Sequence, residues 1–214
     1  MTRAIAEGRA VRIVDRERLA ALGSIEAVVI VGPTCVGKTT LVAAVRDSEL
    51  CTSGAVDVPT RFITRVPRGG DDLVESVHVT DDEFVARVAA GEIELRWTRQ
   101  LDRGRTVRYG FAPPRSGALP VFSANNAILG DAAQLLPSNG LDRALRIAVH
   151  APTELRAHRL RTRSPDLWGH PEEVAHRLAE PGLSDQVHIL VENHGELEAV
   201  AKTELVTLVR SLVG

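Results

Sequence analysis

Residues 26–40 read Glu-Ala-Val-Val-Ile-Val-Gly-Pro-Thr-Cys-Val-Gly-Lys-Thr-Thr, and this stretch decides the fold. Its first six residues are mostly apolar and β-branched, as in a strand buried within a parallel sheet. Residues 32–40 then match the pattern G-x-x-x-x-G-K-[ST], and a helical pattern follows from Thr39 to Asp47. A buried strand before such a loop and a helix after it form the context in which the pattern binds phosphate.

The chemistry of nucleotide binding explains this spacing. Backbone N–H groups of the loop turn inward as an anion nest, and the following helix adds the positive end of its dipole. We expect Lys38 to reach the β- and γ-phosphates and to act in catalysis, and the Thr39 hydroxyl to ligate Mg²⁺. The predicted cofactors are therefore ATP and Mg²⁺. The predicted nucleotide-binding residues are Gly32, Pro33, Thr34, Cys35, Val36, Gly37, Lys38, Thr39 and Thr40.

The lysine count separates this interpretation from a chance glycine-rich turn. Lysines and arginines total 26, and the only lysines are Lys38 and Lys202, which leaves 24 arginines. A chain that strongly prefers arginine nevertheless places a lysine where a phosphate-binding loop requires one. A GTPase is disfavoured, because neither lysine stands in an Asn-Lys-x-Asp guanine clamp.

Composition argues against several other functions. The 214 residues carry a formal net charge of −2, so we expect no surface-wide basic field for nucleic acid or an anionic membrane. Aromatic residues make up 3%, too few for a platform that stacks single-stranded nucleic acid. No apolar run reaches the roughly 20 residues of a membrane helix, and residues 1–17 lack the apolar core of a signal peptide. Two cysteines, Cys35 and Cys51, make no disulfide framework, so we expect a cytoplasmic protein.

Apolar runs alternate with helical patterns along the remaining chain. Further strands are predicted at residues 93–97, 106–110, 119–123, 143–150 and 187–191, and helices at 83–90, 127–136, 152–163, 172–178 and 196–212. The helix at 83–90 begins with a capping-box-like pattern at Thr80 to Glu83. This alternation predicts an α/β fold whose central parallel sheet is covered on both faces. Residues 1–25 are interpreted as an N-terminal extension with a short helix near Arg16 to Leu22.

The region from residue 50 to residue 110 has a looser pattern, and it carries two arginine clusters. Arg61-Phe-Ile-Thr-Arg65-Val-Pro-Arg68 places three arginines within eight residues. The second cluster is Arg96, Arg99, Arg103, Arg105 and Arg108. Arginine forks bind phosphate oxygens in a bidentate manner, so the clusters indicate an acceptor that already carries phosphate. A solvated face in an arginine-rich chain is the alternative, and it is the more favoured reading for the second cluster.

The order of these motifs resembles the guanylate-kinase superfamily over residues 27–212, and within it more closely the ribose 1,5-bisphosphate phosphokinases. The resemblance rests on the phosphate-binding loop, Arg61-Phe-Ile-Thr-Arg65, Leu95-Arg-Trp97, Tyr109-Gly110 and a lid-like helix pattern. It implies a P-loop NTPase three-layer sandwich formed by residues 26–214. An acceptor-binding region at about 50–112 and a lid at about 159–180 would belong to it.

Three residues match the acceptor-phosphate ligands of the superfamily. Arg65 and Arg68 stand where guanylate kinases have two phosphate-binding arginines, and Tyr109 matches the tyrosine of their Tyr-Gly pair. The resemblance therefore assigns all three to the acceptor. Asp71 and Asp72 follow the cluster and are left open between orienting an acceptor hydroxyl and neutralising the arginines.

Three other acceptor-site residues depart from guanylate kinases. Arg61 belongs to the first cluster, Arg96 stands where those enzymes have a guanine-binding Glu, and Asn125 replaces an acidic residue. A carboxylate accepts from guanine N1–H and N2–H₂, and neither an Arg nor a neutral amide replaces it in that role, so GMP is a poor acceptor candidate. Asn125 would suit a sugar hydroxyl, or it could instead cap the helix that follows.

Two arginines match the family's lid, namely Arg163 and Arg177. Phosphoryl transfer needs positive charge at the transferred group and exclusion of water, which an arginine-bearing lid supplies, so both are predicted to be catalytic. Trp168 in the lid loop is expected to pack on the lid rather than to stack on adenine.

The sequence thus predicts an ATP-dependent kinase for a small phosphorylated sugar, with no nucleic-acid or membrane partner, and leaves a homodimer open. The reaction implied by the resemblance is ribose 1,5-bisphosphate plus ATP giving 5-phosphoribosyl 1-diphosphate plus ADP. One alternative is a kinase for a nucleoside or nucleotide hydroxyl. Another is a guanylate-kinase-like binding scaffold without catalysis, which the intact Lys38 and Thr39 disfavour.

Overall fold

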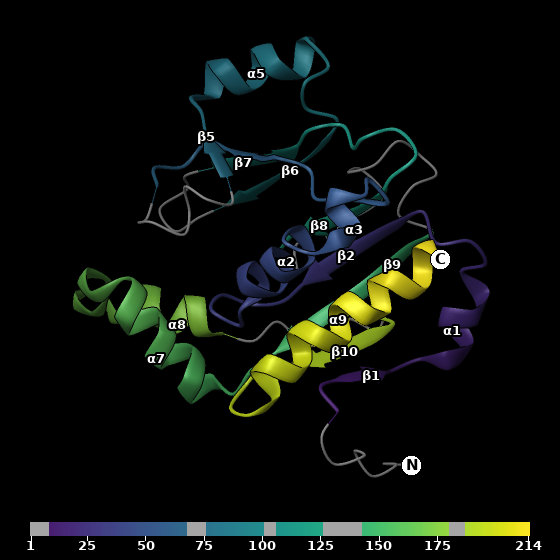
Figure 1. Cartoon of the computed structure of the whole chain (residues 1–214). Helices are drawn as coiled ribbons and strands as arrows, with labels where there is room; N and C mark the ends of the chain where they lie inside the picture. The colour runs from purple at the N-terminus through teal and green to yellow at the C-terminus, as the bar shows by residue number, and fades with distance from the viewer. Residues whose placement is uncertain (1–8, 68–75, 101–105, 126–142, 180–186) are drawn as a thin grey trace.

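The computed structural model describes residues 9–67, 76–100, 106–125, 143–179 and 187–214. It confirms the α/β class: a six-stranded sheet at the centre, five of whose strands are parallel, carries helices α2 and α9 (Figure 1). The strand order is β1 (Val11–Ile13), β10 (Ile189–Glu192), β9 (Ala144–His150), β2 (Ala27–Val31), β8 (Leu119–Ser123) and β3 (Val56–Asp57).

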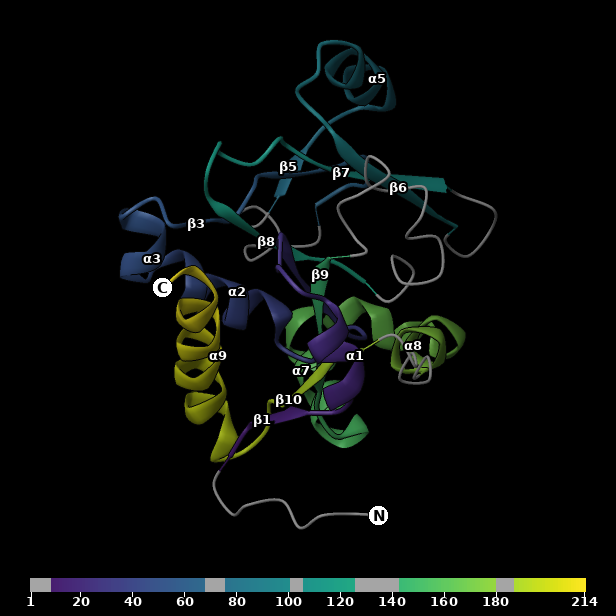
Figure 2. The same ribbon diagram turned by 90° about the vertical axis from the view of Figure 1, so that its right-hand side faces the viewer.

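One face of this sheet packs against two helices that lie side by side, α2 (Lys38–Arg46) and α9 (Leu197–Val213) (Figure 2). In α9 the buried residues Ala201, Leu205 and Val209 recur every four positions and form one apolar stripe. All five residues of β2 are buried, as expected for a central parallel strand. The short helices α1 (Arg16–Ala21) and α3 (Glu49–Thr52) lie at the margin of this core.

A second sheet packs against the opposite face. It has four strands, in the order β5 (Ser76–His78), β4 (Arg61–Ile63), β7 (Thr106–Phe111) and β6 (Leu95–Gln100). Its inner side joins residues of β2, β8, β9 and β10 in one apolar cluster, which contains no helical residue among those described. Helix α5 (Asp81–Ala89) covers the outer side, where Phe84 packs with Phe62 and Ile93. The capping box predicted at its start is present, between Thr80 and Glu83.

The N-terminal extension contributes a strand that the sequence did not reveal. Val11–Ile13 pairs antiparallel with β10 at the edge of the central sheet. The Glu204 carboxylate of α9 accepts hydrogen bonds from the backbone N–H groups of Ala10, at 2.9 Å, and Val11, at 2.8 Å. Three residues are too few to show the alternation of a strand, so the sequence does not indicate it. The strand forms because it pairs with β10, which lies far away in the sequence.

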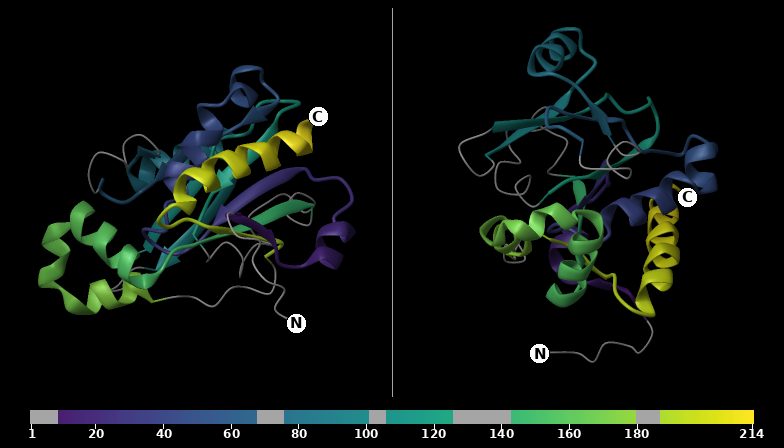
Figure 3. Two further views of the ribbon diagram at one scale, coloured as in Figure 1. Left: turned by 60° about the horizontal axis from the view of Figure 1, so that its bottom comes forward. Right: turned by 90° about the vertical axis from the view of Figure 1, so that its left-hand side faces the viewer.

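The lid region lies at one end of the molecule, where α7 (Thr153–Arg163), the 3₁₀ turn η3 (Pro165–Gly169) and α8 (Pro171–Leu178) project beyond the sheet (Figure 3). The Arg161 guanidinium lies 4.1 Å from the centre of the Trp168 ring, so Trp168 packs on α7. The helix predicted at residues 127–136 lies outside the described residues. None of the helices described is long and apolar enough to cross a membrane.

Candidate phosphate-binding site

The loop at residues 32–40 runs from the carboxyl end of β2 to the start of α2, and its backbone requires glycine at two positions. Gly32 has φ 152° and Gly37 has φ 92°, both positive. A Cβ atom would come within 2.8 Å of the Val149 carbonyl oxygen at position 32 and within 2.0 Å of Asn193 Nδ2 at position 37. Neighbouring atoms therefore leave no room for a side chain, which explains both glycines of the motif.

The carbonyl oxygens of Gly32 to Val36 each receive a hydrogen bond from a side chain. Lys38 Nζ donates to the carbonyls of Gly32, at 2.7 Å, and Pro33, at 2.9 Å. Lys38 is the first residue of α2, so its side chain reaches back along the loop to the two residues with which the loop begins.

Three donors from the C-terminal half of the chain hold the next three carbonyls. Arg156 Nε in α7 donates to the Thr34 carbonyl at 3.0 Å, and Arg159 Nη1, one turn later, to the Cys35 carbonyl at 3.3 Å. Asn193 Nδ2, after β10, donates to the carbonyl of Val36 at 2.6 Å.

These bonds determine where the amide hydrogens of the loop point. In a trans peptide unit the C=O of one residue and the N–H of the next point in opposite directions. Carbonyls held at Thr34, Cys35 and Val36 therefore direct the N–H groups of Cys35, Val36 and Gly37 to the other side of the backbone. Those N–H groups donate to no backbone carbonyl among the described residues. The loop thus presents a row of amide donors suited to phosphate oxygens.

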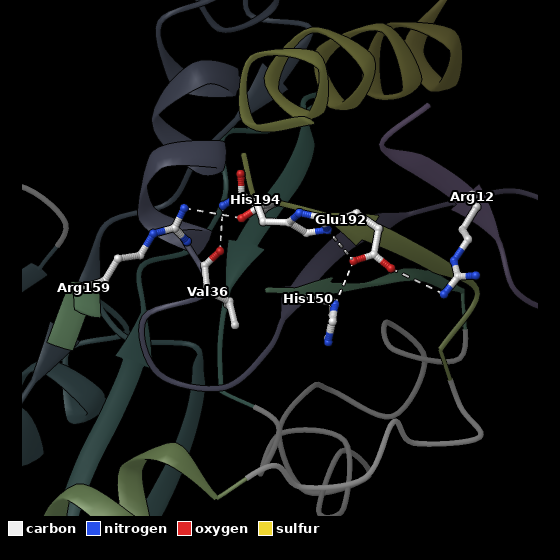
Figure 4. Close-up of polar contacts among 7 residues, drawn as sticks. Arg12, Val36, His150, Arg159, Glu192 and His194 are labelled. Atoms are coloured by element: carbon white, nitrogen blue, oxygen red, sulfur yellow. Dashed lines mark hydrogen bonds and ion pairs between the residues drawn. The ribbon is translucent and has the colours of Figure 1, made fainter. Parts of the chain in front are cut away.

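The segment that carries Asn193 is itself fixed at the end of the sheet. The backbone N–H of Asn193 donates to the His150 carbonyl at 2.8 Å, and its side chain is 1% exposed. Beside it, the Glu192 carboxylate contacts His150 Nδ1 at 2.7 Å and also lies near Arg12 and His194 (Figure 4). This network joins β1 to the carboxyl ends of β9 and β10.

Cationic side chains gather around the loop. Burial is the largest influence on the Cys35 thiol and raises its pKa, while the positive charges of Arg163, Lys38, Arg156 and Arg177 each act to lower it. The three residues predicted to be catalytic, Lys38, Arg163 and Arg177, therefore lie close enough to Cys35 to influence its pKa. Such a concentration of positive charge favours a polyanion at the loop.

The two lid arginines differ in their surroundings. Arg163 is exposed at the last position of α7. The Arg177 side chain in α8 is 9% exposed and forms an ion pair with Glu173 one turn earlier. Its backbone carbonyl accepts a hydrogen bond from Arg156 Nη2 at 3.2 Å.

The predicted acceptor residues are only partly brought together. Arg61, in β4, donates through Nε to Ser76 Oγ at 2.8 Å and through Nη1 to the Ser123 carbonyl at 3.4 Å, so it bridges the two sheets. Asn125 follows β8, whose extension pairs with β2 through the hydrogen bond from Ala124 N to the Ile30 carbonyl, at 3.0 Å. Arg61 and Asn125 therefore lie at the carboxyl ends of β8 and β2, next to the loop.

Tyr109 and Arg96 lie on opposite faces of the four-stranded sheet. Tyr109 faces inward, is 9% exposed, and stacks on Trp97 with ring centres 5.1 Å apart. Arg96, next to Trp97 in β6, is exposed on the outer face, where it pairs with Gly110. Side chains alternate along a strand, so Trp97 faces the inner side of this sheet and Arg96 faces away from it.

The other predicted residues fall outside this cluster or outside the described chain. Arg65 follows β4, and its backbone carbonyl lies 2.6 Å from His78 Nδ1. Arg68, Asp71 and Asp72 lie outside the described residues.

The loop and its surroundings contain one residue that the sequence assigns to Mg²⁺. Thr39, in the first turn of α2, carries a hydroxyl oxygen of the kind that can ligate Mg²⁺. No group of three His, Cys, Asp or Glu side chains able to hold a metal occurs in the described part of the chain. A magnesium ion would therefore be bound mainly by phosphate oxygens and water.

Sequence reasoning missed the three residues that hold the loop from outside, Arg156, Arg159 and Asn193. Arg156 did leave a signal: it stands four residues before Leu160, on the buried stripe of α7. An arginine at an apolar helical position indicates a buried polar partner. Nothing in the sequence indicated that this partner would be a backbone carbonyl.

No protein-family model matches the chain, and no match was found among curated protein sequences. Among solved structures, the chain is similar to a gluconokinase from Sinorhizobium meliloti 1021, with 17% identity and a TM-score of 0.40 over 88% of this chain and 97% of that one. It is also similar to a protein named APE1195, with 18% identity and a TM-score of 0.42 over 89% of this chain and 99% of that one. At these values neither likeness assigns a family or a substrate.

Proposed function

We propose that this protein is an ATP- and Mg²⁺-dependent kinase that phosphorylates a small phosphorylated sugar. One observation carries the proposal: the carbonyls of Gly32 to Val36 are all held by side-chain donors, so that amide hydrogens of the loop are left to bind phosphate. Four cations near Cys35 add the charge that a triphosphate requires.

Each residue of the loop would have a limited task in the transfer. The loop amides and Lys38 would hold the donor phosphates, and Thr39 would place Mg²⁺, which when bound neutralises phosphate charge. Arg163 and Arg177 would stabilise the charge that develops on the transferred group. Catalysis would then depend on positioning and charge neutralisation, with no covalent enzyme intermediate.

The acceptor would bind near Arg61 and Asn125, beside the loop. The favoured acceptor is ribose 1,5-bisphosphate, whose 1-phosphate oxygen would form a new P–O bond to the γ-phosphorus of ATP. The bond from that phosphorus to the ADP oxygen breaks, so the products are 5-phosphoribosyl 1-diphosphate and ADP. Arg65 and Arg68 would bind acceptor phosphate, as the resemblance implies.

The inner face of β6 supports the argument against GMP. Its inward residues there are Leu95 and Trp97, both apolar and buried, so this strand offers guanine no inward carboxylate. The Trp97 ring stacks instead on Tyr109. A role for Tyr109 in binding the acceptor would require this stacked pair to expose the tyrosine hydroxyl.

The experiment is a measurement of ADP release from ATP and Mg²⁺ with a panel of acceptors, using Lys38→Ala as the blank. The panel contains ribose 1,5-bisphosphate, GMP, other nucleoside monophosphates and free nucleosides. We expect turnover on ribose 1,5-bisphosphate alone.

Other results would change the proposal in defined ways. Turnover on a nucleoside or nucleotide would retain the kinase and overturn the acceptor. ATP binding by calorimetry without turnover on any acceptor would contradict the reaction proposed here and favour a binding scaffold. Equal ADP release by the wild type and Lys38→Ala would contradict the assignment of the loop.

A further inference from the structure

Arg156 is the largest side chain that is completely buried in the described structure, with 0% exposure. Removing a guanidinium from water is costly unless its donors are satisfied, because arginine stays charged in proteins. Its burial in the first turn of α7 is therefore not explained by packing alone. The two backbone carbonyls that Arg156 binds explain its burial.

Two of its nitrogen atoms bind backbone carbonyls in different elements. Nε donates to the Thr34 carbonyl in the phosphate-binding loop at 3.0 Å. Nη2 donates to the Arg177 carbonyl in the last turn of α8 at 3.2 Å. The C-terminal end of a helix carries partial negative charge, which stabilises a buried cation there. One rigid, planar group thus joins the loop to the helix that bears a predicted catalytic arginine.

We propose that Arg156 is a positioning residue that transmits the state of the phosphate-binding loop to α8. Phosphate on the loop amides fixes the Thr34 carbonyl, Arg156 fixes the Arg177 carbonyl, and the end of α8 is thereby held with Arg177 facing the loop. The inference rests on the proposed function, because it requires a nucleotide at the loop.

Arg159 provides a matched comparison within the same helix. It donates to the Cys35 carbonyl at 3.3 Å, to the Asn193 carbonyl at 3.4 Å and to Glu198 Oε2 at 3.1 Å. It therefore shares the loop with Arg156, while its contacts in the structure lead to α9 and the end of β10 instead of α8. Replacing Arg159 weakens the loop and leaves the connection to α8 in place.

The test is hydrogen–deuterium exchange of the full chain with and without ADP and Mg²⁺, followed in peptides that cover residues 171–179. Calorimetry sets the ADP concentration so that each variant is saturated. In the wild type we expect ADP to slow exchange in α8 by about fivefold or more, because a bound loop restrains local opening. Arg159→Gln should bind ADP more weakly and show the same slowing at saturation.

Arg156→Gln should bind ADP and lose the slowing. Arg156→Lys keeps the charge but spans a single carbonyl, so we expect it to restore part of the effect. A purely structural role would change exchange in α8 equally with and without ADP, so the ADP-dependent difference isolates the coupling. In turnover assays, Arg156→Gln should lower kcat, whereas Arg159→Gln should mainly raise the KM for ATP.

Three outcomes would overturn the inference. The first is ADP binding to the wild type with no slowing in α8, a result that needs no variant and stands even if Arg156→Gln does not fold. The second is a slowing that persists in Arg156→Gln. The third is calorimetry showing no ADP binding to the wild type, which would overturn the proposed function as well and is thereby distinguished from the first two.

Discussion

The phosphate-binding loop meets its proposed ligand with backbone groups, whereas the four-stranded sheet meets the proposed acceptor with side chains. In the loop, Gly32 and Gly37 fix a backbone path that no other residue can follow, and carbonyls are held from outside. In the sheet, the direction of each side chain depends on strand register, which places Trp97 inward and Arg96 outward.

This difference matters for what a residue pattern can predict. A backbone site depends on glycines and on chain direction, both of which a short motif encodes. A side-chain site on a strand is reversed by a shift of one position. The motif around residues 32–40 therefore indicated the path of the backbone there, whereas no pattern indicated which face of the sheet carries Arg96.

The strongest test of the loop is removal of its lysine. Lys38→Ala should lower the rate of ADP release by about 10²–10³-fold, as for loss of one donor to developing charge. The control is Lys202→Ala, which removes the only other lysine, in α9, and should leave the rate unchanged. Similar losses in both variants would place the effect in overall charge or stability and not in the loop.

A substitution that adds one methyl group tests the backbone conformation of the loop. Gly37→Ala should lower the free energy of unfolding by about 2–3 kcal/mol, because the new Cβ strains a positive φ and displaces Asn193 from the Val36 carbonyl. Gly54→Ala is the matched variant: φ is 83° there and nothing lies within 4 Å of a Cβ, so about 1 kcal/mol is expected. Urea unfolding measures both, and equal losses would contradict the clash with Asn193.

On the acceptor side, Arg61→Ala and Arg96→Ala should behave differently. Arg61 bridges Ser76 and Ser123 beside the loop, so its removal should raise the acceptor KM about tenfold, which corresponds to roughly 1.4 kcal/mol. Arg96 is exposed on the outer face, and its removal should leave the KM within about twofold. Steady-state kinetics measure the acceptor KM of both variants. A larger increase for Arg96→Ala than for Arg61→Ala would assign Arg96 to the acceptor site despite its outward position in the sheet.

The smallest expected effect is a pH dependence of the free energy of unfolding, which comes from a histidine next to the central sheet. Burial lowers the pKa of His188, and the positive charges of Arg146 and Arg18 lower it further. Its Nδ1 accepts the Arg146 backbone N–H at 2.9 Å, so the neutral ring is the one that fits. Below the ordinary value of about 6.5 the unfolded chain binds a proton that the folded chain resists, and stability falls as the pH drops.

We expect His188→Gln to flatten this pH dependence, since an amide oxygen also accepts the bond but does not titrate. Urea unfolding between about pH 7.5 and pH 5 provides the comparison. Parallel profiles for the wild type and His188→Gln would assign the acid sensitivity to other groups.

Much of the core could be predicted because burial leaves a period or a run in the sequence. The run at residues 26–31 became β2, the helical patterns at 152–163 and 196–212 became α7 and α9, and Thr80 with Glu83 formed the expected capping box. The edge strand β1 and the short strands β3, β4 and β5 were not found, since two or three residues carry no period. Their pairing partners lie elsewhere in the chain.

By itself, the sequence determined the turn at residues 32–40, the lysine that follows it and the α/β class, because glycine conformation and apolar periodicity are local properties. Only the tertiary structure decided what holds the loop open. Arg156, Arg159 and Asn193 lie between 122 and 157 residues from the loop carbonyls that they bind, and no local pattern links them. The same holds for Arg61 and Arg96, whose facing depends on how distant strands pair. Hydrogen bonds to backbone carbonyls depend on three-dimensional proximity, and that proximity exists only once the sheet has assembled.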